Sequence, residues 1–531
     1  MRNLGSKISR IIITGVLILL QIIWTIIFLL KITACSNMVG IVLKIMSIIF
    51  VIYLMGKDDN STYRMGWIFL IMLWPVVGVL GYLFFGGKKP TKKMKKRTDS
   101  VRQDIMTYLV QNETVAEKFR SENKRCWQTG EYIYKYSFYP YHHNSKAKYY
   151  ECGEKMFDDM LKAIDEAEKY IFLEYFIIDE GIMWSEILER LVTKAEEGVK
   201  IRIIYDDMGC VALLPWDYKK YLEGLHDNIE CMVFNQIRPF LDMVMNHRDH
   251  KKILVVDGKV GFTGGINIAD EYINKKEKYG YWKDTGIKIE GDAVVNFVMM
   301  FLENWRSNVV DSVDVRFFLP EKGEKDKLHE VQHAEREPGE KKYEEKKCEE
   351  NAFVQPFVHT PFGKEAVAEQ VYIELLNQAR DYVYIYTPYL IIAYEMRSAL
   401  CLAAKRGVDV KIVVPGVPDK KLVYRLTRAN YKTLLNVGVK IYEYAPGFLH
   451  GISYVCDDKI AVLGTINMDF RSLYLQFECG VFLYGSEVIY DMRRDCEETL
   501  KKSYEITLTN RKNNIFDKLL VGILRVFSPL M

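Results

Sequence analysis

The sequence predicts an α/β protein made of two similar halves, preceded by apolar segments long enough to cross a membrane. A motif that begins at His250 is written again at His450, at a constant offset of 200 residues. Each half also alternates apolar, strand-type runs with helical patterns, which is typical of sheets covered by helices. A repeat at a fixed offset indicates two copies of one structural unit.

Length and composition allow more than one domain. The 531 residues are 49% hydrophobic, which is enough for several buried cores. A net charge of +3 is close to balance, so bulk charge does not indicate a nucleic-acid binder. The ten cysteines are scattered singly without a CxxC pair, which predicts reduced thiols and neither a disulfide framework nor a metal site.

The N-terminal region, residues 1–87, is predicted to hold two or three transmembrane helices. Ile11 to Leu30 is a charge-free run of twenty residues, the length needed to cross hydrocarbon. Val39 to Met55 is shorter and contains Lys44, whereas Met65 to Phe85 is long enough to span. A cleaved signal peptide is the alternative for the first run, but further apolar segments follow it.

A basic cluster follows the last apolar segment. Seven basic residues lie between Lys88 and Arg97, against three before the first span. The positive-inside rule therefore places everything after Lys88 in the cytoplasm. We treat 88–150 as a juxtamembrane connector, whose basic cluster either contacts anionic headgroups or only fixes the topology.

Residues 151–320 and 351–510 are predicted to be the two halves. The strand-type runs Tyr170 to Ile178 and Tyr382 to Ile392 are each followed by a helical pattern, a glycine and a second apolar strand. Gly198 and Gly407 lie where a helix ends and a parallel strand begins, as C-cap glycines do.

Two further segments flank or join the halves. Residues 321–350 are dominated by Glu and Lys and are expected to form a solvated linker or insertion. In 511–531 apolar residues recur at helical spacing. A core helix would explain that pattern, but the terminal position and the apolar N-terminus favour an amphipathic helix on the bilayer surface.

The repeated motif is His-x-Lys with an Asp seven residues after the His. It is followed by Gly-Gly-x-Asn in the first copy and by Gly-Thr-x-Asn in the second. The first copy supplies His250, Lys252, Asp257 and Asn267. The second supplies His450, Asp457 and Asn467, but Ile452 stands where the lysine is expected.

These paired motifs resemble the signature of the phospholipase D superfamily and, within it, of the bacterial cardiolipin synthases. The resemblance extends to GYWKDT, TPYLI, PDKKLVYRLTRANY, INMDFRSLYLQFECG and the closing FSPLM. It implies two phospholipase D-like halves, with mixed sheets flanked by helices, in a pseudo-two-fold arrangement behind transmembrane helices. It also implies a multi-pass protein of the bacterial plasma membrane, with its catalytic halves in the cytoplasm.

The activity implied by the resemblance is phosphatidyl transfer between two phosphatidylglycerol molecules, giving cardiolipin and glycerol. The partners are then phosphatidylglycerol and anionic membrane lipids, with no nucleic acid and no cofactor. Two imidazoles suit this chemistry because near pH 7 one can attack phosphorus while the other donates a proton. The motifs do not indicate an oligomeric state.

The resemblance also implies roles for the individual residues. His250 would form a phosphatidyl-histidine while His450 protonates the departing glycerol, although these two roles could be exchanged. The expected phosphate ligands are Lys252, Asn267 and Asn467, and the carboxylates that orient the imidazoles are Asp284 and Glu478. Asp257 and Asp457 belong to the motifs but are more often structural than catalytic.

The missing lysine weakens the predicted site. In an alternating strand, residue 452 points to the same face as His450, so an apolar group replaces a cation beside the phosphate. Losing a comparable charge stabiliser costs ~10²–10³ in rate. Arg471 or Lys459 could compensate; otherwise Ile452 is a recent damaging change, or the protein has become an anionic-lipid binder or partner subunit. The other intact motif residues favour a weakened enzyme.

A second basic group lies in the C-terminal half. Lys420, Lys421, Arg425 and Arg428 fall on one predicted helix, where they form either a solvated face or a surface for lipid headgroups.

Overall fold

The computed structural model describes residues 37–57, 61–86, 92–237, 247–309, 313–319, 352–363, 365–508 and 515–527, together with five isolated helical positions between residues 16 and 27. The predicted linker 321–350 and most of the predicted first span, Ile11 to Leu30, lie outside the described residues.

Each half contains a mixed sheet, as predicted. The first sheet has the order β1 (Ser145–Tyr150), β9 (Gly286–Gly291), β7 (Val260–Gly264), β6 (Lys252–Val256), β2 (Tyr170–Tyr175), β3 (Lys200–Asp206) and β4 (Ile229–Phe234). Strands β2, β3 and β4 are parallel, and the remaining pairs are antiparallel.

The second sheet repeats this order strand by strand. It runs β10 (Phe353–His359), β17 (Gln476–Tyr484), β16 (Ile460–Gly464), β15 (Ser453–Cys456), β11 (Tyr382–Tyr386), β12 (Asp409–Pro415), β13 (Lys440–Tyr444) and an added β18 (Ser503–Glu505). Because the first seven strands match the first sheet in order and direction, the predicted duplication is confirmed.

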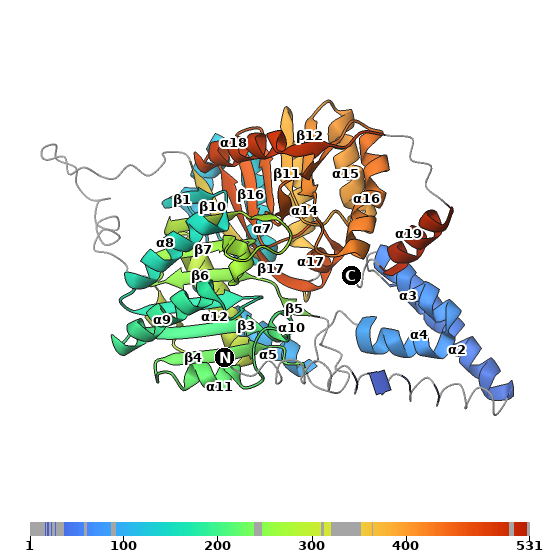
Figure 1. Cartoon of the computed structure of the whole chain (residues 1–531), viewed down its shortest axis with the longest axis horizontal. Helices are drawn as coiled ribbons and strands as arrows, with labels where there is room; N and C mark the ends of the chain where they lie inside the picture. The colour runs from blue at the N-terminus through green and yellow to red at the C-terminus, as the bar shows by residue number, and fades with distance from the viewer. Residues whose placement is uncertain are drawn as a thin grey trace, which may run out of the picture.

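Helices cover the sheets in both halves (Figure 1). Those of the first half are α8 (Gly153–Asp165), α9 (Ile182–Glu196), α10 (Asp207–Cys210), α11 (Tyr218–Glu223) and α12 (Val294–Asn308). Those of the second are α14 (Val367–Gln378), α15 (Tyr394–Lys405), α16 (Lys421–Leu435), α17 (Phe470–Tyr474) and α18 (Val488–Lys501). Gly198 and Gly407 follow α9 and α15 with φ of 96° and 94°, left-handed values that favour glycine, so their predicted capping position is confirmed.

The two halves exchange short strands at their interface. β5 (Arg248–Asp249) pairs with β17 of the second half, and β14 (Gly447–Leu449) pairs with β8 (Tyr281–Lys283) of the first. Both pairings are parallel, and each involves the segment that leads directly into a motif histidine. The backbone itself therefore ties His250 and His450 to the opposite half.

The largest hydrophobic core joins the halves rather than lying within one of them. Phe297 and Phe301 of α12 belong to the same cluster as Phe172 of β2 and Val383 of β11. Ile171 and its alternate neighbours on β2 instead face a second core beneath α8 and α9. Because side chains alternate along a strand, β2 contributes to both cores and fixes the relative position of the halves.

The predicted connector 88–150 is more than a connector. It forms α5 (Lys92–Met106), α6 (Glu113–Glu122), α7 (Lys124–Ser137) and β1. Since β1 pairs with β9 along six residues from Ser145 to Tyr150, the sheet of the first half begins before the predicted boundary at 151. The apolar–polar alternation of this short strand is weak, which is why composition did not reveal it.

The predicted third span, Met65 to Phe85, is not one continuous helix. α3 (Ser61–Leu73) ends before Pro75, and α4 (Pro75–Gly81) and a π-helical turn, η1 (Tyr82–Gly86), follow. The residue before a proline disfavours helical geometry, and Trp74 accordingly has φ −134° and ψ 86°. The chain folds back so that a Cβ on Gly78 would lie 2.5 Å from Cα of Ile71.

The second predicted span forms α2 (Asn37–Met55). Among the helices of the described residues, none combines the length and hydropathy that a membrane crossing requires. The expected set of transmembrane helices is therefore not supported within this part of the chain.

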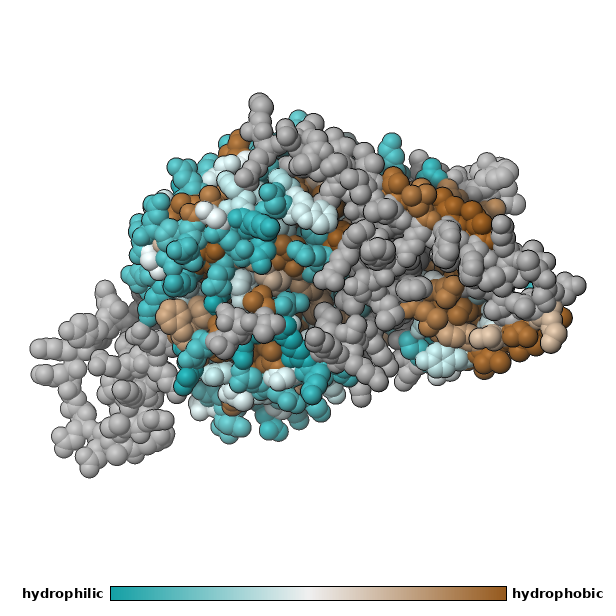
Figure 2. All heavy atoms as spheres, turned by 90° about the horizontal axis from the view of Figure 1, so that it is seen from below, coloured by the Kyte–Doolittle hydropathy of each residue, from teal (hydrophilic) through white to brown (hydrophobic). Residues whose placement is uncertain are grey.

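The C-terminal segment forms α19 (Ile515–Phe527), as predicted. It contacts α16 and α3, and Arg525 Nη2 donates to the carbonyl of Ala429 at 3.1 Å. Figure 2 shows hydrophobic residues gathered at the end of the molecule that carries α2, α3 and α19 in Figure 1. Large apolar side chains exposed there are Ile45, Ile49, Ile52, Met65, Phe69, Met72, Leu519 and Ile523.

Candidate active site

His250 is fixed by the second half through both its backbone and its ring. It follows β5, and its N–H donates to the carbonyl of Phe477 at 2.8 Å. Its Nδ1 lies 2.9 and 3.0 Å from the two carboxylate oxygens of Glu478. Since Nδ1 is engaged, Nε2 is the ring nitrogen left for chemistry.

His450 repeats this arrangement with the first half. Its N–H donates to the carbonyl of Lys283 at 2.7 Å, and its Nδ1 lies 2.8 Å from Oδ2 of Asp284. Trp282 Nε1 also donates to that carboxylate oxygen at 3.2 Å.

Asp284 and Glu478 occupy corresponding positions in the two sheets. Asp284 comes two residues before Gly286, which pairs with Gly264, and Glu478 comes two residues before Gly480, which pairs with Gly464. The structure therefore brings each predicted carboxylate to an imidazole. The carboxylate and the imidazole that it holds always come from different halves.

The two histidines line a single cavity of about 400 Å³. Aromatic rings form much of its wall: Phe176 lies 5.0 Å from the ring of His250, while Trp282 and Tyr272 lie 5.5 and 5.6 Å from that of His450. The other polar or charged residues lining it are Asn267, Glu271, Lys278, Asp419, Lys420, Asn467, Asp469, Arg471 and Gln476.

Lys252 is buried directly behind His250. Its Nζ donates to the carbonyl of His250 at 2.7 Å. Burial lowers the pKa of Lys252 to about 8, although the negative charge of Glu478 opposes that shift. Burial also lowers the pKa of His250 well below its ordinary value, and the positive charge of Lys252 adds to the effect. Both effects favour the neutral imidazole of His250.

The two motif asparagines both line the cavity but differ in their bonding. Asn267 Oδ1 accepts from the N–H of Ile177 at 3.0 Å, and its Nδ2 donates to the hydroxyl of Tyr272 at 2.7 Å. Asn467 is 4% exposed, and its Oδ1 has no hydrogen-bond partner among the described residues. A buried amide atom without a partner is uncommon, so Oδ1 of Asn467 is available to accept a hydrogen bond from a ligand.

Asp257 and Asp457 hold the backbone instead of facing the cavity. Asp257 accepts from the N–H groups of residues 168, 169 and 170, each at 2.8 Å. Asp457 accepts from those of residues 380, 381 and 382 at 2.8 to 3.0 Å. Each ties its β-turn to the start of a neighbouring strand, which fits the structural role expected for these two residues.

Ile452 is 1% exposed, and its N–H donates to Oγ1 of Thr285 at 3.3 Å. Of the two cations considered as substitutes, Lys459 is exposed in the turn between β15 and β16 and does not line the cavity. Arg471 does line it, and burial lowers the pKa of its guanidinium. Arg471 is therefore the better placed of the two.

Sequence reasoning missed the aromatic wall and Lys278, and it named Lys420 only as part of a basic helix face. Trp282 lies two residues before Asp284 within GYWKDT, so the motif itself contained that signal. No pattern in the sequence indicated Tyr272 or Phe448, because their contact with His450 depends on how the two halves pack together. Lys278 and Lys420 lie at the mouth of the cavity with side chains 44% and 64% exposed.

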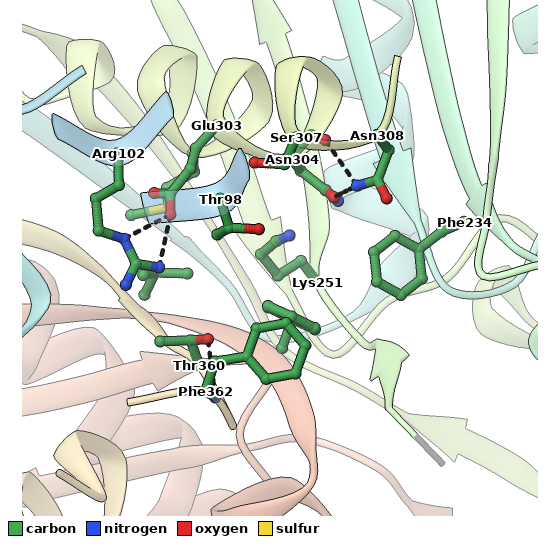
Figure 3. Close-up of a pocket in the computed structure, with 13 residues that line it drawn as sticks. Thr98, Arg102, Phe234, Lys251, Glu303, Asn304, Ser307, Asn308, Thr360 and Phe362 are labelled. Carbon is green, nitrogen blue, oxygen red and sulfur yellow. Dashed lines mark hydrogen bonds and ion pairs between the residues drawn. The ribbon is translucent and has the colours of Figure 1, made fainter. Parts of the chain in front are cut away.

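Behind the strand pair β5–β17 lies a second, separate polar region. The side chain of Lys251 points into this region because side chains alternate along a strand, and it forms ion pairs with Glu174 and Asp249. Figure 3 shows Lys251 between Asn304 and Ser307 of α12 and the loop that carries Thr360 and Phe362. This cavity of about 30 Å³ has room for about one water molecule. The residues that line this cavity support the strand that leads to His250. The cavity itself is too small for a lipid headgroup.

Two imidazoles in one cavity, each held through Nδ1 by a carboxylate of the opposite half, define a phosphoryl-transferring enzyme of the phospholipase D superfamily. Residues 160–286 and 372–500 match the family described as "Cardiolipin synthase, PLD-like domain". Residues 42–87 match "Phospholipase_D-nuclease N-terminal". The chain belongs to the cardiolipin synthase family of this superfamily.

Relatives match along almost the whole chain. An uncharacterised protein of Streptococcus mutans is 40% identical over 91% of this chain and 99% of its own length. A cardiolipin synthase of Alkalihalophilus pseudofirmus is 31% identical over 92% of both chains. The crystal structure of a phosphatidylserine synthase from Haemophilus influenzae covers 76% of this chain and 98% of its own, with a TM-score of 0.53 and 14% identity, which shows a common fold.

Proposed function

We propose that this protein is a cardiolipin synthase, a phosphatidyltransferase that joins two phosphatidylglycerol molecules and releases glycerol. The observation that carries the proposal is the shared cavity in which Nδ1 of His250 and of His450 each contact a carboxylate from the other half. Family membership and the similarity to the Alkalihalophilus pseudofirmus cardiolipin synthase support the choice of lipid.

In the first step Nε2 of His250 attacks the phosphorus of the donor lipid. A nitrogen–phosphorus bond forms, the bond from phosphorus to the glycerol oxygen breaks, and His450 gives that oxygen its proton. In the second step the hydroxyl of another phosphatidylglycerol attacks phosphorus while His450 takes up its proton. The nitrogen–phosphorus bond then breaks and releases cardiolipin.

The choice of His250 as the nucleophile follows from its surroundings. An imidazole attacks only when it is neutral, and burial beside Lys252 lowers the pKa of His250. His450, held through Nδ1 by Asp284, is then left to give the departing glycerol its proton.

The donor phosphate would be held by Lys252 and by the amides of Asn267 and Asn467. Lys252 is the one motif lysine, and the NH₂ group of Asn467, whose side chain lines the cavity, can donate a hydrogen bond from the second half. Such preorganised donors act most strongly on the charge that develops in the transition state. Arg471 adds positive charge at the cavity wall, which moderates the loss of the second lysine.

We place the protein at the bacterial plasma membrane, attached through residues 1–87, with both catalytic halves on the cytoplasmic side. The exposed apolar side chains of α2, α3 and α19 lie on one end of the molecule, beside the second half (Figures 1 and 2). The basic residues that follow Lys88 favour the cytoplasmic side for the remainder of the chain. A first crossing by Ile11 to Leu30 fits this placement.

The direct test is expression in bacteria from which the other cardiolipin synthases have been deleted. Thin-layer chromatography and mass spectrometry of the lipid extract should show cardiolipin, and His250→Ala and His450→Ala should each abolish it. Protein incubated with labelled phosphatidylglycerol and quenched in denaturant at alkaline pH, where the nitrogen–phosphorus bond survives, should carry label on His250 in the wild type and none in His250→Ala.

A second candidate is a catalytically impaired protein that binds anionic lipid or serves as a partner subunit. Ile452 favours it, because that residue removes a cation expected beside the phosphate. The deletion strain separates the candidates. An extract without cardiolipin, from cells in which the intact protein binds phosphatidylglycerol vesicles, supports the binder and rejects the synthase.

A further inference from the structure

Cardiolipin synthesis places two phosphates in the site at the same time. The donor phosphate lies between the two imidazoles, and its glycerol departs on the side of the proton donor. The acceptor's glycerol hydroxyl must then take the position of the departed glycerol. The acceptor's own phosphate therefore lies one glycerol farther out, toward the mouth of the cavity. A cation at that mouth would recognise it without touching the donor phosphate.

The mouth offers two lysines, one from each half. Lys278 is bound to Glu271 at 2.8 Å, so its ammonium group is already paired. Lys420 precedes α16, and its Nζ lies 3.8 Å from Oδ2 of Asp419, a loose contact. That same oxygen accepts the hydroxyl hydrogen of Tyr389 at 2.6 Å. Lys420 meets Asp419 only at this long distance, and its Nζ lies 5.3 Å from the centroid of the Tyr389 ring, so Lys420 is the more available of the two lysines.

The position of Lys420 suits an anion that enters from solvent. Its side chain is 64% exposed, yet it lines the same cavity as His250 and Asn467. Its charge is among those that lower the pKa of His250, after burial, Lys252 and His450, so its field reaches the reacting groups. The remaining carboxylate of that wall, Asp469, accepts from the N–H of Ser472 at 2.8 Å.

We propose that Lys420 binds the phosphate of the acceptor phosphatidylglycerol and thereby selects a phospholipid over a neutral alcohol as acceptor. This assignment rests on the proposed synthase function. Lys420 takes no part in cleaving the donor, which His250, His450 and Lys252 accomplish. The phosphatidyl group passes from His250 to the acceptor hydroxyl oxygen, and that hydroxyl proton goes to His450, whichever acceptor is bound.

The test compares three acceptors on the purified full-length protein: phosphatidylglycerol, its deacylated form glycerophosphoglycerol, and glycerol. Label transferred from donor phosphatidylglycerol to each acceptor is measured. Lys420→Gln should lower transfer to both phosphate-bearing acceptors about 10–100-fold, the effect expected for losing a charge-assisted hydrogen bond. Exchange with labelled glycerol should stay within about twofold. Lys420→Arg should retain most of the transfer to phosphatidylglycerol.

Lys421 provides a matched control. It is the next residue, carries the same charge and is exposed, but it does not line the cavity. Lys421→Gln should leave transfer to all three acceptors unchanged. Equal losses for Lys420→Gln and Lys421→Gln would mean that general surface charge matters, and the assignment would be overturned.

Other outcomes are equally decisive. Equal losses of glycerol exchange and cardiolipin formation in Lys420→Gln would place Lys420 on the donor phosphate and reject its role with the acceptor. A loss with phosphatidylglycerol but not with glycerophosphoglycerol would place it on the membrane surface, and would reject it as well. A wild-type protein that exchanges glycerol but makes no cardiolipin overturns the proposed function itself, and the acceptor assignment with it.

Discussion

Arg471 occupies in the second half the position that Glu271 occupies in the first. Each follows its motif asparagine by four residues, and each lines the cavity between the two histidines. Glu271 adjoins Tyr272, which packs against His450. The charge of Arg248, two residues before His250, acts on Arg471. The pseudo-two-fold cavity is therefore asymmetric in charge, with an arginine in the second half where the first half has a glutamate.

Replacing Ile452 with lysine should restore the missing cation. We expect Ile452→Lys to raise turnover of phosphatidylglycerol by the purified protein at least about tenfold, since a comparable charge stabiliser is worth ~10²–10³ in rate. Ile452→Met, which adds no charge, is the control and should stay near the wild-type rate. An unchanged or slower Ile452→Lys enzyme of normal melting temperature would show that the asymmetric cavity needs no second lysine.

Removing the charge of Asp284 or Glu478, the carboxylates that hold the imidazole of the opposite half, should lower kcat. Glu478→Gln and Asp284→Asn each leave a neutral amide against an imidazole Nδ1, which disturbs its tautomer and removes support for its cationic form. In serine proteases the comparable exchange costs about 10⁴ in kcat, and we expect on the order of 10² or more here.

Steady-state kinetics on both variants provide the measurement. Asp314→Asn, which changes an exposed carboxylate that pairs with Arg316, serves as the control. Full activity in either catalytic-site variant would remove the carboxylates from the mechanism.

Activity should fall as the pH rises through about 8. Burial lowers the pKa of Lys252 to about 8, so its ammonium group is charged below that pH and neutral above it. The phosphate therefore loses its main cation on the alkaline side. Initial rates of glycerol exchange between pH 6 and 10, with circular dichroism at each pH to exclude unfolding, would show this limb. Retention of full activity at pH 10 would contradict the role of Lys252 as the charged ligand.

Asp257→Ala should destabilise the first half more than it slows the chemistry. The substitution leaves three backbone N–H groups without their acceptor, which costs at least about 2 kcal/mol. We expect a lower melting temperature, with turnover per folded molecule changed by less than about threefold. Asp457→Ala should have the same effect on the second half, because Asp457 also accepts three backbone hydrogen bonds. A large loss of turnover in a protein of unchanged melting temperature would show that Asp257 and Asp457 act in catalysis and not in stability.

The apolar face of α19 should contribute to membrane binding. Leu519 and Ile523 are 64% and 44% exposed, so Leu519→Asp and Ile523→Asp place charge on that face without opening a core. Sedimentation with phosphatidylglycerol vesicles should show weaker binding, and activity on short-chain phosphatidylglycerol in micelles should persist. Leu402→Asp changes a leucine that is 51% exposed on α15 and serves as the control. Equal binding by all three variants would contradict a membrane role for α19.

Much of the fold and of the site could be predicted from the sequence, because these features depend on local residue patterns. The repeat offset, the glycines at 198 and 407 and the strand–helix alternation depend only on neighbouring residues, and each agreed with the structure. The expected single helix from Met65 to Phe85 is not what the structure shows, because hydropathy measures apolar content, whereas Pro75 decides whether the helix continues. The strand β1 was missed because its own apolar–polar alternation is weak and its partner, β9, lies more than a hundred residues away.

The sequence by itself determined which chemical groups are present: two imidazoles, one motif lysine, two asparagines and two carboxylates. Only the tertiary structure decided their pairing, because β5 and β14 cross to the opposite half and carry each histidine to the other half's carboxylate. It also brought Arg471, Lys420 and the aromatic rings to the same cavity. Contacts between residues so distant in the chain arise from how two folded halves pack, and no local pattern encodes that packing.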